Sequence, residues 1–102
     1  MLEKNNIPEI RYQGNSEVSV SGALTFETVA ALWKKGQAVL PKKENLTFNL
    51  EAVSRSDSAG LGLLIEWLSL AKHQKQQFRF THVPEQLKAI ARVSGLEEML
   101  MC

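Results

Sequence analysis

The residues best able to do chemistry lie in one short run, Asp57-Ser58-Ala59-Gly60-Leu61-Gly62. The run opens the longest apolar segment of the chain, 59–65, and a helix is expected to begin at Ser58. At a helix N-terminus, Asp57 or Ser58 can accept a hydrogen bond from a free first-turn amide, which is worth about 1 kcal/mol. A phosphate on Ser58 would also be stabilised there, because the helix dipole is positive at that end. The run therefore supports a helix cap and a phosphorylatable switch position.

Catalysis would require Ser58 to meet a base. His73 lies on the same predicted helix, about 22 Å away at about 1.5 Å rise per residue. His82 could emerge near Ser58 after the following strand, but no third group is evident to orient it. Gly60 and Gly62 do not complete a nucleophile elbow or a phosphate loop, and the acidic residues and histidines lack metal-ligand spacing. We expect a domain that is not an enzyme and holds no metal or other cofactor.

Alternating and helical patterns indicate the elements that position this run. Alternation predicts a hairpin over 7–21, turning at 14–15, and strands over 46–50 and 78–83. Apolar spacing of three and four predicts helices over 25–39, capped by Thr25, over 58–74, and from Pro84 to near Gly95. Residues 54–57 are expected to form a polar loop. Strands joined through helices pair in parallel, so the order predicts one small α/β domain over 1–102. Its mixed sheet has the hairpin as an antiparallel edge, with helices packed mainly on one face.

Composition narrows the classes of partner. The 12 basic and 11 acidic residues leave a net charge of +1, which gives no broad field to hold a phosphate backbone, so nucleic acid is not expected. The single cysteine, Cys102, excludes an intramolecular disulfide framework. The N-terminus has no signal-peptide pattern, and the longest apolar run is far shorter than the roughly 20 residues of a membrane span. We expect a soluble cytoplasmic domain without direct membrane insertion.

The predicted helix over 58–74 carries more apolar surface than one core face requires. At about 100° per residue, one sector of the helix holds Leu61, Leu64, Ile65, Leu68 and Ala71. A second sector, centred about 130° away, holds Leu63, Trp67 and Leu70. Two interpretations stay open: a neighbouring helix covers the second sector, or the sector is a partner surface around Trp67. The second interpretation is supported by the enrichment of aromatic anchors at interface centres.

The stretch 53–62, between a strand ending at Leu50 and a long apolar helix, resembles the signature of STAS domains, the anti-sigma-factor-antagonist-like modules. Residues 21–24 and 93–96 extend this resemblance over nearly the whole chain. The resemblance implies a small STAS-like fold and places Ser58 at the phosphorylatable position of the family. Many STAS domains carry an acidic pair where this chain has Ala23 and Thr25, and this departure argues against kinase docking or nucleotide contact.

One branch of the family is especially similar. Leu32-Trp33, Val53-Ser54-Arg55 and the end of the second helix (Leu70-Ala71-Lys72, Gln74) resemble the small cytoplasmic subunit of an ABC phospholipid transporter that maintains outer-membrane lipid asymmetry. The resemblance implies a non-catalytic protein that binds and supports the ATPase subunit, within a complex with a membrane permease. The partner-binding residues that we expect are Asp57, Ser58, Ala59, Leu63, Trp67 and Leu70. The alternatives are an anti-sigma factor antagonist regulated by phosphorylation of Ser58, and a nucleotide-binding module.

Overall fold

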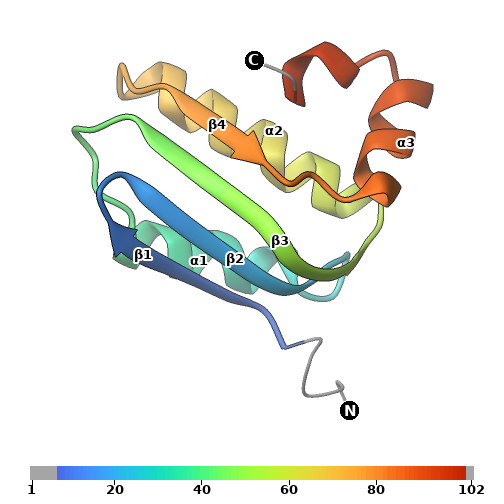
Figure 1. The fold of residues 1–102 in the computed structure, drawn as a ribbon, viewed down its shortest axis with the longest axis horizontal. Helices are drawn as coiled ribbons and strands as arrows, with labels where there is room; N and C mark the ends of the chain where they lie inside the picture. The colour runs from blue at the N-terminus through green and yellow to red at the C-terminus, as the bar shows by residue number, and fades with distance from the viewer. Residues whose placement is uncertain (1–6, 101–102) are drawn as a thin grey trace.

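The computed structural model describes residues 7–100, which form a four-stranded mixed sheet with helices (Figure 1). The strands, in their order across the sheet, are β1 (Glu9–Gly14), β2 (Glu17–Leu24), β3 (Leu46–Ser56) and β4 (Phe78–Thr81). β1 pairs antiparallel with β2, whereas β2 with β3 and β3 with β4 are parallel. The helices are α1 (Val29–Val39), α2 (Ser58–His73), α3 (Glu85–Val93) and the 3₁₀ turn η2 (Glu97–Leu100). The predicted mixed α/β sheet with an antiparallel N-terminal hairpin is confirmed.

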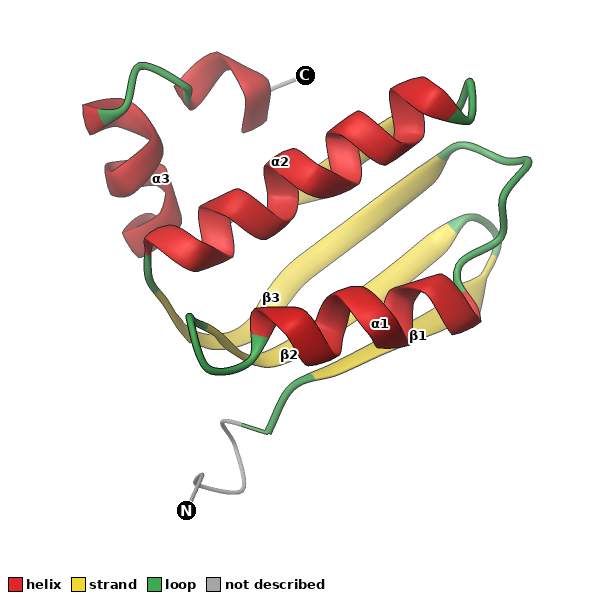
Figure 2. Ribbon diagram, turned by 180° about the vertical axis from the view of Figure 1, so that it is seen from behind, coloured by secondary structure: helices red, strands yellow, loops and turns green. Residues whose placement is uncertain are grey.

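The two longest helices cover one face of the sheet. Figure 2 shows α1 and α2 side by side over the strands, with α3 at one end of the sheet against the start of α2. Side chains that point to this face, such as Val18, Phe48 and Leu50, are fully buried. Their neighbours on the opposite face, such as Thr47 and Asn49, are polar and partly exposed. The alternation of β-strands therefore produces a two-layer structure with one bare, polar face.

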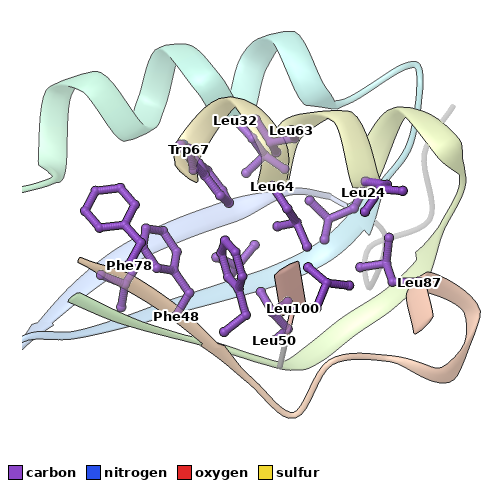
Figure 3. Close-up of a cluster of buried hydrophobic side chains, with 14 of the residues drawn as sticks. Leu24, Leu32, Phe48, Leu50, Leu63, Leu64, Trp67, Phe78, Leu87 and Leu100 are labelled. Carbon is purple, nitrogen blue, oxygen red and sulfur yellow. The ribbon is translucent and has the colours of Figure 1, made fainter. Parts of the chain in front are cut away.

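Trp67 lies inside this core (Figure 3), so the predicted partner surface around its indole is wrong. The side chain is 1% exposed, and its ring centroid lies 4.9 Å from that of Phe48. α1 covers the second apolar sector of α2, and Gly36 of α1 packs against the Trp67 indole. A Cβ atom on Gly36 would lie 3.5 Å from the indole nitrogen of Trp67. The interpretation that a neighbouring helix covers this sector is the correct one.

The first helix begins four residues later than the sequence predicts, at Val29 instead of Thr25. A buried threonine explains the difference. The Thr28 hydroxyl donates a hydrogen bond to the Ala23 carbonyl at 2.6 Å and accepts one from the Thr25 amide at 2.9 Å. These bonds hold residues 25–28 in a turn, and Thr28, not Thr25, takes the N-cap position. The turn leaves the Phe26 side chain 82% exposed.

Residues 54–56 continue β3 and do not form the predicted loop. Ala23 pairs with Arg55 and Leu24 with Ser56, after register shifts earlier in the β2–β3 ladder. This segment is polar and has no apolar alternation, so its sequence does not indicate a strand. Its pairing partners in β2 are more than thirty positions away in the sequence. Asp57 is consequently the only residue between β3 and α2. At the next connection, β4 ends at Thr81 and Pro84 is the N-cap of α3, not its first residue.

Candidate docking surface around Ser58

Asp57 joins three parts of the structure. Its Oδ1 accepts a hydrogen bond from the Ala59 amide at 2.9 Å, which caps α2 as predicted. Its Oδ2 accepts a second bond from the Phe26 amide at 3.1 Å, and its own amide donates to the Leu24 carbonyl at 3.1 Å. One carboxylate therefore fixes both the start of α2 and the turn that leads to α1.

Ser58 is the first residue of α2, and its side chain is exposed. Its hydroxyl has no hydrogen-bond partner within residues 7–100, because Asp57 supplies the cap. A group attached to this oxygen would project into solvent at the N-terminal end of α2. The position therefore has the access and the positive helix end that a phosphoserine requires.

An apolar groove runs between α1 and α2 next to Ser58, with a volume of about 450 Å³. Its lining consists of Val29, Ala30 and Trp33 from α1 and Ala59, Gly62, Leu63 and Glu66 from α2. We call this the α1–α2 groove. Phe26 lies at the same end, since its amide binds the carboxylate of Asp57. The groove, Phe26, Asp57 and Ser58 together form what we call the docking surface.

The structure brings four of the six predicted partner-binding residues to this surface. Asp57 and Ser58 lie at its end, Ala59 lines the groove, and Leu63 forms part of the groove wall although it is only 4% exposed. The other two residues lie elsewhere. Trp67 is in the core, and Leu70 is twelve residues beyond Ser58, about 18 Å along the helix axis. Leu70 lines a separate hollow with Leu40, Pro41 and Phe78 at the far end of the two helices.

Sequence reasoning missed the contribution of α1 to this surface. Phe26, Val29 and Trp33 fit the apolar spacing of a helix that begins at Thr25, and that spacing predicts them all on a core face. The turn at 25–28 rotates Phe26 outward, and Trp33 remains only partly buried at the groove. Thr28 stands where a threonine often caps a helix, but its side chain bonds to Ala23 and Thr25 and to no helix amide, so the sequence held no clear signal for this turn.

The histidines and the tyrosine of the chain do not line the α1–α2 groove. Within residues 7–100 no group of three or more histidine, cysteine, aspartate or glutamate side chains could hold a metal ion. His73 lies at the C-terminal end of α2, opposite to Ser58. The pKa of Tyr12 is raised because its hydroxyl donates a hydrogen bond to the Glu44 carboxylate, which ties β1 to the segment before β3. Neither of these two residues lines the α1–α2 groove.

The family model described as "Mlab, STAS domain" matches residues 10–101. The chain belongs to this STAS domain family. The resemblance predicted from residues 53–62 is thereby confirmed. STAS domains are generally non-catalytic modules. Within the part of this STAS domain that the structure describes, none of the helices has the length and apolarity needed to cross a bilayer.

The STAS domain also resembles a solved structure, described as "Structure of the Anti-Sigma Factor Antagonist SpoIIAA in its Unphosphorylated Form". The two share 17% sequence identity with a TM-score of 0.66, over 89% of this chain and 83% of that chain. At this level of identity the likeness establishes the fold alone. No sequence among the curated proteins matches the STAS domain significantly.

Proposed function

We propose that this STAS domain is the MlaB-like, non-catalytic subunit of an ABC phospholipid transporter that maintains outer-membrane lipid asymmetry. It binds and supports the MlaF-like ATPase subunit, which belongs to a complex with a membrane permease. The domain is then cytoplasmic and peripheral at the inner membrane. The Mlab description of the matching family model supports this assignment. The observation that carries it is the docking surface, an apolar groove bordered by an exposed phenylalanine.

The energetics of the docking surface favour a protein partner. Phe26 is 82% exposed, and burying a phenylalanine side chain stabilises a complex by about 1.5–3 kcal/mol. The α1–α2 groove has the form that receives one face of an apolar helix, with Val29 and Trp33 on one wall and Leu63 on the other. Asp57 and Ser58 provide a polar rim at its end, as is usual at interfaces. We therefore expect a helix of the ATPase subunit to lie in this groove.

Co-purification with the ATPase subunit tests the proposal. Phe26→Ala removes the exposed ring, and Gly62→Leu fills the groove from a position where a Cβ atom meets nothing within 4 Å. Each change should weaken ATPase binding about tenfold or more, the cost of losing an interface anchor. Val93→Ala is the matched control, because Val93 is 90% exposed but lies at the end of α3 and does not line the groove. Unchanged retention of the ATPase by the Phe26 and Gly62 variants would contradict the proposal.

The exposed hydroxyl of Ser58 supports a second candidate, an anti-sigma factor antagonist switched by phosphorylation. A phosphate would add about two negative charges beside the apolar groove and change what binds there. This candidate requires stoichiometric phosphate on Ser58 in cells and an anti-sigma factor as the retained partner. Mass spectrometry of the complex isolated from cells distinguishes the two functions. Recovery of the ATPase with an unmodified Ser58 excludes the second candidate.

A further inference from the structure

A second hollow, with a volume of about 320 Å³, lies on the other side of α2 from the α1–α2 groove. Its apolar lining comes from Leu68, Ala71 and Phe78, and its polar lining from Lys72, Gln76, Gln77 and Arg79. It adjoins the start of β4 at Phe78 and Arg79. β4 forms the border of the sheet beneath α2 (Figures 1 and 2). We call it the β4-edge hollow. It shares no lining residue with the docking surface.

The backbone of β4 has an unpaired side at this border. Among residues 7–100 the strand pairs only with β3, in a parallel register that sets Leu46 opposite Phe78 and Phe48 opposite Phe80. The Leu46 amide donates to the Gln77 carbonyl at 2.9 Å, so the peptide groups of alternate β4 residues face β3. The peptide groups of Phe78 and Phe80 consequently face outward. A row of free donors and acceptors at a sheet border is a template for another strand.

The two faces of such an added strand would contact different kinds of residue, apolar on one face and basic on the other. Phe78 and Phe80 point under α2, so side chains on that face of the new strand would contact Leu68 and Ala71. Arg79 points to the opposite, bare face of the sheet and is exposed. An extended segment that fits both faces alternates apolar and acidic residues.

Unpaired positive charge surrounds the β4-edge hollow. Lys72 and Arg79 line it, Lys75 lies in the turn before β4, and no aspartate or glutamate is in the lining. Within residues 7–100 the ion pairs join other residues, namely Arg11 with Glu9, Lys88 with Glu85 and Arg92 with Glu97. The cations at this border therefore lack carboxylate partners in the described part of the chain. Charge complementarity selects an acidic occupant.

Gln76, which also lines the hollow, has a side-chain oxygen without a hydrogen-bond partner in the described residues. Gln76 is 8% exposed, and its Nε2 donates to the carbonyls of Pro41 at 2.9 Å and Glu44 at 2.7 Å. Its Oε1 accepts no hydrogen bond within the described residues, although it is buried. An unsatisfied buried acceptor destabilises the fold.

We propose that β4 accepts an added strand from a partner protein, an extended segment in which apolar residues alternate with acidic ones. The probes are two blocked hexapeptides, one alternating valine with glutamate and one alternating valine with lysine. They are titrated into the ¹⁵N-labelled full chain while amide chemical shifts and hydrogen exchange are recorded. The glutamate peptide should shift the amides of β4 and of the second half of α2, and it should slow exchange at Phe78 and Phe80. The lysine peptide should leave both unchanged.

Charge-reversal variants complete the test. Lys72→Glu with Arg79→Glu should weaken binding of the glutamate peptide about tenfold, because the cross-strand charge pair with Arg79 is lost and both new carboxylates repel the acidic peptide. Lys34→Glu with Arg55→Glu changes the net charge equally, away from the β4-edge hollow, and should have less than about a twofold effect. The proposal is overturned if no β4 amide responds or if both peptides act alike. It is also overturned if free glutamate reproduces the shifts, or if β4 pairs with a second copy of this chain.

Discussion

Replacing Gly60 by alanine is expected to force α2 away from β2, whereas the same change at Gly62 is expected to stabilise the helix. A Cβ atom on Gly60 would lie 2.5 Å from the carbonyl oxygen of Leu24 and 3.0 Å from its Cβ. Both atoms belong to a buried strand end, so they cannot swing aside as the tip of a side chain would. Overpacking of this kind costs about 1–3 kcal/mol, which outweighs the gain of up to about 1 kcal/mol from the higher helix propensity of alanine. A Cβ atom on Gly62 meets nothing within 4 Å, so only the gain remains.

Urea denaturation of the two variants and the wild type measures this difference. Gly60→Ala should lower the free energy of unfolding by about 1–2 kcal/mol, and Gly62→Ala should raise it by up to about 1 kcal/mol. In a domain of this size the melting temperatures should then differ by roughly 10 °C. Equal stability of the two variants would refute the close approach of α2 to Leu24. Because Asp57 also binds the Leu24 carbonyl, the docking surface of Gly60→Ala should be disturbed as well.

Three further predictions follow from individual contacts. Asp57→Ala removes the bonds to the Ala59 and Phe26 amides and should cost about 1–3 kcal/mol by urea denaturation, with Asp57→Asn, which keeps one acceptor, losing less. Tyr12 is the single tyrosine of the chain, so the ultraviolet absorbance of tyrosinate reports its pKa directly, and Glu44→Gln should lower that raised pKa towards its ordinary value. A tyrosine pKa that is higher in the folded than in the unfolded state stabilises the fold at pH values below the unfolded pKa, and this stabilisation is lost as the pH rises through the folded pKa. The stability of wild type should therefore fall relative to that of Tyr12→Phe over this pH range. A constant difference in stability between the two proteins up to pH about 11 would contradict the contact. Ser56→Ala removes a buried hydroxyl that has no hydrogen-bond partner within the described residues. The variant should therefore be at least as stable as wild type in thermal melts. A clear loss of stability would show that the hydroxyl does have a hydrogen-bond partner.

Much of the fold was predictable because its elements have local signals. α2 begins at Ser58 as expected, since an aspartate before an apolar run is a strong start signal. The hairpin turns at Gly14 and Asn15, where both residues have positive φ angles. The end of α3 near Gly95 follows from the same preference of glycine for positive φ.

The parts that the sequence hid depend on contacts between distant residues. The start of α1 is decided by the buried Thr28 hydroxyl, whose acceptor is the Ala23 carbonyl in the preceding strand. The extra length of β3 depends on pairing with β2 across more than thirty positions of sequence. The burial of Trp67 depends on α1, and helical periodicity alone cannot assign an apolar sector to a neighbouring helix or to solvent. For the same reason four of the six predicted partner-binding residues lie together, and the other two do not.

The position of α2 has a consequence for assembly. One flank of this helix, at Gly62 and Glu66, faces the α1–α2 groove, and the other, at Leu68 and Lys72, faces the β4-edge hollow. The two sites therefore lie on opposite sides of one helix and share no lining residue. The proposed ATPase subunit and the extended segment proposed for β4 could therefore bind at the same time, and the domain would then act as an adaptor between two polypeptides.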